Sequence, residues 1–139
     1  MDPERCYSAQ TLSLSHSQRP VDSCMRTPIA MIGNDADLLF YRAAVLRCAG
    51  WQTVIAAPSE VETLMANQEN FPLAIFCTTL SSIERSSIAA LFRQRSPETK
   101  LLLLLRGRTP PPDADTFDET MFALDGPTVL IGMVQRLAC

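Results

Sequence analysis

The stretch LAIFCTTLSS, residues 73–82, is an apolar run that ends in Cys77 and gives way at once to Thr, Leu and Ser. It lacks the apolar–polar alternation of a strand with one face in water. It therefore predicts a strand buried on both faces, as in a parallel sheet covered by helices. Cys77 then lies at the carboxyl end of this strand, the edge at which open α/β sheets bind their ligands.

Four more apolar runs share this character, and segments with a helical period separate them. With the first run they give five candidate strands, at residues 28–32, 53–57, 73–77, 100–105 and 120–124. Strands that alternate with helices favour an α/β fold with a parallel sheet. We therefore predict a three-layer, doubly wound sandwich with a five-stranded parallel sheet in the middle.

Capping signals place the helices between these strands. Ser followed three residues later by Glu is the capping box of a helix N-terminus, and Pro suits the first turn of a helix. The expected helices are residues 36–49 ahead of Gly50, one helix that begins at Ser59 and Glu62, one that begins at Ser81 and Glu84, and a last helix from Pro127.

The segment RGRTPPPDADTFDE, residues 106–119, is the weak element of this pattern. Its consecutive prolines remove backbone donors and fix φ, and it has no apolar period to bury. The fourth helix is therefore expected to be shortened or missing, with a loop here or at most one turn near residues 113–117.

Size and charge restrict the class of protein. The chain has 139 residues, 47% of them hydrophobic, which suits one domain with an ordinary core. A formal charge of −3 and a pI near 5.1 provide no basic surface for nucleic acid. The longest apolar stretch, LLLLL at 101–105, is far too short to cross a membrane. Neither direct nucleic-acid binding nor a membrane span is expected.

Residues 1–26 are rich in Ser, Gln and charge without periodicity, so we predict a disordered N-terminal tail ahead of one domain at 27–139. The five cysteines are odd in number and irregularly spaced, and they contain no CxxC pair. They fit reduced thiols in a cytoplasmic protein.

The segments IAMIGND, LLFYRAAVLRCAGWQTVIAA and PLAIFCTTLSSIERSSIAALFRQRSPETKLLLLL together resemble the receiver domain of bacterial response regulators. The resemblance covers nearly all of residues 27–138. Gly33 and Gly50 have the separation that the family shows between the end of its first strand and the end of its first helix, and Trp51 supplies the aromatic residue that follows. The resemblance implies a flavodoxin-like sheet in the order 2-1-3-4-5.

The same resemblance implies a phosphoryl-transfer site that these residues do not reproduce. Receivers accept a phosphoryl group on an aspartate that ends the third strand, and this position is Cys77. They hold Mg²⁺ with a pair of acidic residues after the first strand, and Gly33 and Asn34 stand there, with Asp35 as the nearest carboxylate. Mg²⁺ requires several oxygen ligands in near-octahedral order, so we expect no metal and no cofactor.

Two further family positions also differ. The hydroxyl residue that ends the fourth strand is replaced by Leu105, with Arg106 beside it. The lysine that follows the fifth strand is replaced by Leu124 or Asp125. A site without the acceptor, the acidic pair and the lysine lacks the groups that phosphoryl transfer uses.

Three hypotheses about function follow. The first is a phosphorylation-independent pseudo-receiver, not an enzyme, that binds a protein partner of unknown identity in signal transduction or transcriptional regulation and can form a homodimer. The second is a thiol-based redox sensor or enzyme that uses Cys77, perturbed by Arg106 or by a helix N-terminus. The third is a small-ligand sensor at the neutralised pocket around Gly33, Cys77 and Leu105.

Overall fold

The computed structural model describes residues 27–67 and 70–139, so the predicted tail at 1–26 lies outside the described residues. Strands and α-helices alternate along the chain, except between β4 and β5. They are β1 (Ile29–Ile32), α3 (Ala36–Cys48), β2 (Thr53–Ala56), α4 (Val61–Asn67), β3 (Leu73–Phe76), α5 (Ser82–Arg95), β4 (Lys100–Leu105), β5 (Glu119–Phe122) and α6 (Pro127–Ala138).

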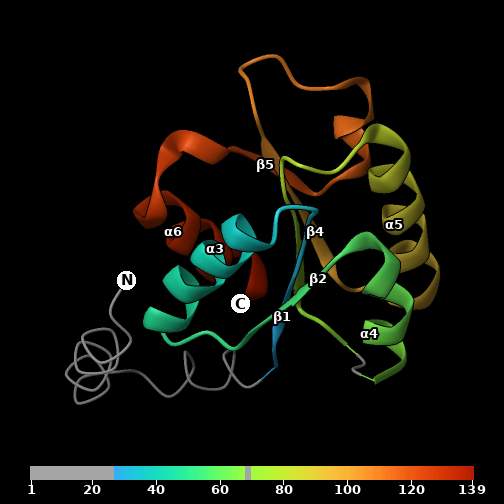
Figure 1. Ribbon diagram of the computed structural model, residues 1–139, viewed down its shortest axis with the longest axis horizontal. Helices are drawn as coiled ribbons and strands as arrows, with labels where there is room; N and C mark the ends of the chain where they lie inside the picture. Colours follow the sequence, from blue (N-terminus) through green and yellow to red (C-terminus); the bar gives the residue numbers. More distant parts are fainter. Residues whose placement is uncertain (1–26, 68–69) are drawn as a thin grey trace.

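The five strands form one parallel sheet in the order β2-β1-β3-β4-β5 (Figure 1). The central strand β3 pairs on both sides, with Phe76 aligned to Ile32 of β1 and to Leu103 of β4. Both the predicted fold class and the predicted strand order are confirmed. The residues after β1 and β3 consequently meet at one edge of the sheet.

Figure 1 shows the three layers, with α3 and α6 on one side of the sheet and α4 and α5 on the other. Two apolar cores, one on each face of the sheet, hold these layers together. Alternate residues of each strand point to opposite faces, so Ile32 and Phe76 pack under α4 and α5 while Met31 and Cys77 pack under α3 and α6. Every residue of β1 and β3 is buried. The continuous apolarity of these runs therefore reflects helices on both faces.

Most helix ends agree with their capping signals, and one does not. The hydroxyl of Ser81 accepts from the backbone N–H of Glu84, and the Glu84 carboxylate accepts from the N–H of Ser81, as predicted. The predicted cap of Ser59 and Glu62 is wrong. A 3₁₀ turn, Pro58–Glu60, begins earlier, and Glu60 accepts from the N–H of Ala57 at 2.8 Å. Pro58 fixes a helical φ, so the 3₁₀ turn begins one residue before Ser59.

The segment between β4 and β5 contains no α-helix, only the 3₁₀ turn Pro112–Thr116, which confirms the predicted loss of the fourth helix. The predicted strand at 120–124 is displaced. It ends at Phe122, and Ala123–Asp125 form a 3₁₀ turn instead. An apolar run predicts burial rather than backbone conformation, and Leu124 is 88% exposed.

The described cysteines differ in their covalent state. Cys48 and Cys139 are disulfide-bonded, whereas Cys77 is a free, buried thiol. The expectation of reduced thiols is therefore wrong for two of the five cysteines, because spacing alone does not show which sulfur atoms a fold brings together.

Among the described helices, none combines the length and the apolarity that crossing a bilayer requires.

Candidate functional site

The sheet topology brings the loops after β1, β3 and β4 to one edge. Gly33, Asn34 and Asp35 follow β1, Cys77 follows β3, and Arg106 follows β4. Gly33 and Asn34 contact the loop after β3, which begins with Cys77. We describe them in turn, since each has partners that decide what it can do.

Gly33 is buried where two loops approach closely. A Cβ atom at this position would lie 3.0 Å from the Cβ atom of Cys77, 3.0 Å from Oγ1 of Thr79 and 3.2 Å from Cδ2 of Leu39. At these distances the neighbouring atoms would have to move by a few tenths of an ångström to admit a Cβ atom. Gly33 and Cys77, two of the three residues around which we placed a neutralised pocket, are therefore in direct contact.

Asn34 ties the loop after β1 to the loop after β3. Its backbone N–H donates to Oγ1 of Thr79 at 2.8 Å, and its side-chain Nδ2 donates to the carbonyl of Thr79 at 3.0 Å and to Oε1 of Glu84 at 2.9 Å. The two side-chain bonds need an amide, because a carboxylate lacks the N–H donors. Asn34 therefore serves as a connector between β1 and the start of α5.

Asp35, the nearest carboxylate to these residues in sequence, has a structural task. Its Oδ1 accepts from the backbone N–H of Leu38 at 3.2 Å, and it is the N-cap of α3. Asp is among the preferred N-cap residues because its oxygen satisfies a donor that the first helical turn leaves free.

Cys77 is buried under α3, with a side chain 1% exposed. Its backbone N–H donates to the carbonyl of Ile32 at 2.9 Å. Burial raises the pKa of the thiol to about 11, although the nearby Arg42 guanidinium opposes this shift by its charge and its hydrogen bonding. The thiol is consequently protonated at neutral pH, and thiolate chemistry is suppressed.

Arg42 is the residue near Cys77 that sequence reasoning missed. Leu39, Arg42, Ala43 and Leu46 occupy the positions i, i+3, i+4 and i+7 of α3, which form one face of a helix. The sequence signal that could have identified Arg42 is its charge among the apolar residues of this helix face. The Nη1 atom of Arg42 is buried and has no hydrogen-bond partner in the described part of the chain.

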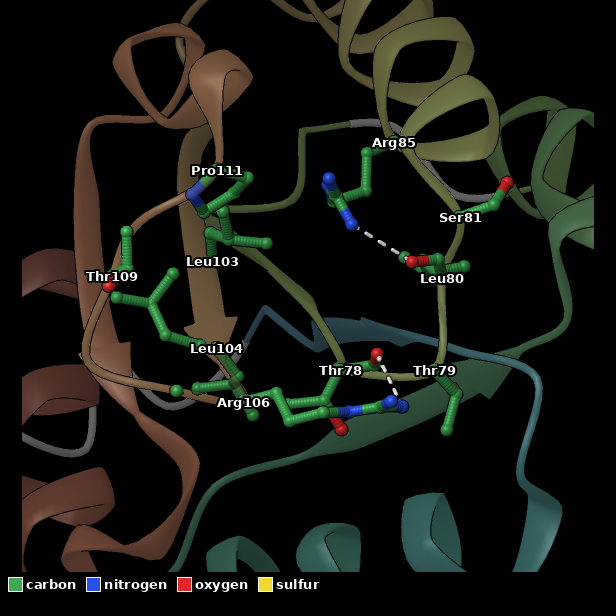
Figure 2. A pocket seen from close by; sticks show the side chains of 12 residues that line it. Thr78, Thr79, Leu80, Ser81, Arg85, Leu103, Leu104, Arg106, Thr109 and Pro111 are labelled. Atoms are coloured by element: carbon green, nitrogen blue, oxygen red, sulfur yellow. Dashed lines mark hydrogen bonds between the residues drawn. The ribbon is translucent and has the colours of Figure 1, made fainter.

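Arg106 was expected near the thiol, but it lies at a separate groove. Its Nη2 donates to the carbonyl of Thr78 at 3.4 Å, as Figure 2 shows. The groove, of about 400 Å³, is lined by Leu105 and Arg106 on one side and by Thr78 and Arg85 on the other. Neither Gly33 nor Cys77 lines it. The ligand pocket that we predicted around Gly33, Cys77 and Leu105 is therefore not formed by these three residues together.

Arg85 contributes little free charge to this groove. Its guanidinium makes two bonds of 2.9 Å with the carboxylate of Asp113 and a third, of 2.9 Å, with the carbonyl of Leu80 (Figure 2 shows the bond to Leu80). Pairing with Arg85 lowers the pKa of Asp113. The pair fixes the 3₁₀ turn that follows the groove to α5.

Leu124 and Asp125 lie in the 3₁₀ turn after β5 and are exposed. Neither residue supplies a cation. The guanidinium of Arg42, which comes from α3, is the positive charge that acts on the Cys77 thiol.

No protein-family model and no curated protein matches this sequence. Solved structures do match in fold. The chemotaxis protein CheY4 of Vibrio cholerae superposes with a TM-score of 0.69 at 15% identity, over 80% of this chain and 98% of CheY4. The response regulator TrrA of Thermotoga maritima, in complex with Mg²⁺–BeF, superposes with a TM-score of 0.68 at 17% identity, over 80% and 98%.

TrrA in complex with the histidine kinase ThkA superposes with a TM-score of 0.67 at 17% identity, over 80% of this chain and 97% of the other. The chain has the receiver fold. At this identity the likeness concerns the fold alone, so the residues at the site decide what the receiver fold can do here.

The residues at this edge of the receiver fold do not fit the Mg²⁺ ion that the resemblance implies. Asn34 spends its amide N–H groups on Thr79 and Glu84, Asp35 caps α3, and the Cys77 thiol is buried. Across residues 27–67 and 70–139, no three His, Cys, Asp or Glu side chains form a group that could hold a metal ion. Mg²⁺ prefers carboxylate oxygens and its own water molecules in octahedral geometry.

Proposed function

We propose that this chain is a phosphorylation-independent pseudo-receiver, which acts as a protein-binding module in bacterial signal transduction or transcriptional regulation. The observation that carries the proposal is the state of Cys77. It takes the position that the resemblance assigns to the phosphoacceptor aspartate, and it is a buried thiol in contact range of Arg42. A buried neutral thiol neither accepts a phosphoryl group nor binds Mg²⁺.

The surrounding bonds support the same proposal. In a receiver that works by phosphorylation, acidic groups hold the metal and a lysine neutralises the phosphoryl charge. Here Asn34 is a hydrogen-bonded connector, and Leu124 is exposed to solvent. The hydrogen bonds of Asn34 hold the loops at this edge in one arrangement.

A module without this chemistry acts through its surface. Large apolar side chains are exposed on α3 and on the turn before α6, namely Phe40 (63%), Tyr41 (52%) and Leu124 (88%). Exposed apolar groups that gather on one part of a protein are typical of partner-binding surfaces. TrrA is known in complex with a histidine kinase; for this chain we propose a protein partner, or a second copy of the chain.

The thiol hypothesis has less support. A reactive cysteine is partly exposed and has a lowered pKa, whereas the Cys77 thiol is 1% exposed and its pKa is raised to about 11. No observation at this edge favours redox chemistry over partner binding.

The experiment that tests the pseudo-receiver is phosphoryl uptake. The full chain is incubated with acetyl phosphate and Mg²⁺, beside a receiver domain that is phosphorylated in the same mixture, and both are analysed by intact-mass spectrometry. We expect a phosphoryl adduct on the reference protein and none on this chain. An adduct that maps to Cys77 or Asp35 would overturn the proposal.

A further inference from the structure

The groove between the loop after β3 and the loop after β4 is bordered by the segment that replaces the fourth helix. Its volume is about 400 Å³, which lies within the range of about 300–1,000 Å³ that is typical of small-molecule sites. Leu105 and Pro111, both partly buried, give it apolar surface, and Thr78 and Thr109 give it hydroxyl groups. A groove with both kinds of surface suits a ligand that has a polar end and an organic body.

The ionisable side chains that line the groove are all arginines. Arg85 reaches it from α5 and Arg106 from the loop after β4, and Figure 2 shows their guanidinium groups on opposite sides. No Asp or Glu is among the described residues that line it. The lining therefore has positive charge and many hydrogen-bond donors, which favours a ligand that is negative and accepts hydrogen bonds.

Arg106 carries the charge that no carboxylate neutralises. Arg85 is paired with Asp113, whereas Arg106 belongs to none of the ion pairs among the described residues. The side-chain hydrogen bond of Arg106, from Nη2 to the carbonyl of Thr78, is 3.4 Å long and exceeds the usual length of about 2.7–3.2 Å. A guanidinium has several N–H donors, so those of Arg106 are available to a ligand.

We propose that this groove reversibly binds a small organic phosphate ester, with the phosphate group at Arg106 and the organic part against Leu105 and Pro111. Guanidinium groups bind phosphate through charge-assisted hydrogen bonds. The terminal oxygens of a phosphate point in several directions, whereas those of a carboxylate lie in one plane. A phosphate can therefore accept from Arg106 and from the hydroxyl groups of Thr78 and Thr109, which can rotate toward it.

This site differs from the phosphoryl-transfer site that the resemblance implies. Gly33, Asn34 and Cys77 do not line the groove. Binding here forms no covalent bond and uses no metal ion. The proposal therefore does not rest on the pseudo-receiver proposal, and each of the two can fail without the other.

The experiment is a heteronuclear NMR titration of the labelled full chain, without divalent cations, with adenosine monophosphate (AMP) and phenyl phosphate as probes. We expect saturable shifts at Thr78, Gly107 and Thr109 that dialysis reverses. Adenosine and phenol have the same organic parts without the phosphate, so their affinities should be lower by about tenfold or more. Inorganic phosphate lacks the organic part and should also bind about tenfold less tightly.

Two matched substitutions test the anchor. Arg106→Met keeps much of the length of the side chain and removes the charge, so AMP affinity should fall about tenfold or more. Arg106 is exposed, so the variant should keep the fold, which its own NMR spectrum checks. Arg108→Met is the control, because Arg108 is an exposed arginine of the same loop that lies over the ring of Phe122 and does not line the groove. It should bind AMP within about twofold of the wild type, since salt screens exposed charges.

Several results would overturn the proposal. They are the absence of saturable shifts with both esters, equal affinity for an ester and its phosphate-free partner, undiminished binding by Arg106→Met, and an equal loss in Arg108→Met. Inorganic phosphate that binds as tightly as AMP would overturn the role of the organic part. Benzoate that binds as tightly as phenyl phosphate would overturn the choice of phosphate over carboxylate. Shifts that persist after dialysis would overturn reversible binding.

Discussion

Gly33 and Cys77 are in such close contact that a Cβ atom on the glycine would lie 3.0 Å from the Cβ atom of the cysteine. The loops after β1 and β3 therefore touch at the position where a receiver carries out its chemistry. A side chain on Gly33 would strain this contact, and the contact lies where the third hypothesis placed a neutralised pocket.

We predict that Gly33→Ala lowers the free energy of unfolding by about 1–3 kcal/mol. The added methyl group would meet Cys77, Thr79 and Leu39, and two of the neighbouring atoms, the Cys77 Cβ and the Thr79 Oγ1, lie close to the backbone. Chemical denaturation measures the change. Gly132→Ala is the matched control, because it adds the same methyl group in α6 with no atom within 4 Å, and it should stabilise by about 0.5–1 kcal/mol. Equal effects of the two substitutions would contradict the close-contact argument.

Receivers have an acidic residue at the position of Asn34, and introducing one here should lower the stability of the fold. We predict that Asn34→Asp removes the donor to the Thr79 carbonyl and lowers the free energy of unfolding by about 1 kcal/mol. The new carboxylate would also face that of Glu84, so the deficit should be smaller below about pH 4, where carboxyl groups are protonated. Denaturation midpoints at two pH values measure both effects.

The neighbouring Asp35→Asn is the control for this prediction. It exchanges the same two groups in the opposite direction, and Asn is as good an N-cap as Asp. It should leave stability unchanged, because a cap needs only the oxygen that accepts from Leu38. If Asn34→Asp were also neutral, Asn34 would not be the connector between the loops.

Restoring the acceptor itself should harm the fold. We predict that Cys77→Asp lowers the free energy of unfolding by about 2–4 kcal/mol, because it buries a carboxylate at a position that is 1% exposed. Arg42 can offset part of this cost by its charge. Cys77→Ala, which removes only the sulfur, should cost about 1 kcal/mol. A denaturation midpoint that rises in Cys77→Asp would contradict the argument.

The sequence predicted the sheet well for a physical reason. Runs such as 73–77 and 100–105 are apolar throughout because helices cover both faces, and that requirement is visible in the residues themselves. The end of the fifth strand was harder to predict from the sequence, since the apolar run 120–124 includes Leu124, which is exposed. Composition does not distinguish a strand from a 3₁₀ turn over so few residues.

The candidate site was predicted only in part. Position at the sheet edge follows from topology, so Gly33, Asn34 and Cys77 were found together. The direction of a long side chain does not follow from topology, so Arg106 was expected at the thiol while Arg42 lies there. Asn34 was named only as a lost acidic residue, and its bonds to Thr79 depend on the exact approach of two loops.

The ionisation of Cys77 gives a prediction at alkaline pH. Burial raises its pKa from 9.0 to about 11 in the folded chain. The unfolded chain therefore loses the proton first, and the stability that the neutral thiol contributes is complete below about pH 9 and is lost as the pH rises towards 11. We expect wild type to lose on the order of 2 kcal/mol more than Cys77→Ala over this range. Parallel pH dependence of the two proteins would show that the thiol is not protected, as would rapid alkylation of Cys77 by iodoacetamide at neutral pH.

The ion pair of Arg85 and Asp113 explains how the segment that lost its helix stays in place. The two bonds join α5 to the 3₁₀ turn Pro112–Thr116, and the side chains are 15% and 19% exposed. We predict that Asp113→Asn lowers the free energy of unfolding by about 1–2 kcal/mol and increases amide hydrogen exchange in residues 106–118. The exposed pair of Arg95 and Glu62, at 3.8 Å, is the control, and Glu62→Gln should change stability by less than about 0.5 kcal/mol.

The pH dependence of this pair has a definite sign. Arg85 lowers the pKa of Asp113 below 3.8 in the folded chain. The unfolded chain therefore binds the proton first as the pH falls, so the contribution is present above about pH 4 and is lost as the pH falls through the lowered folded value. The difference in stability between wild type and Asp113→Asn should shrink over that range. A difference that grows on acidification would mean that the pair does not hold the segment between β4 and β5 against α5.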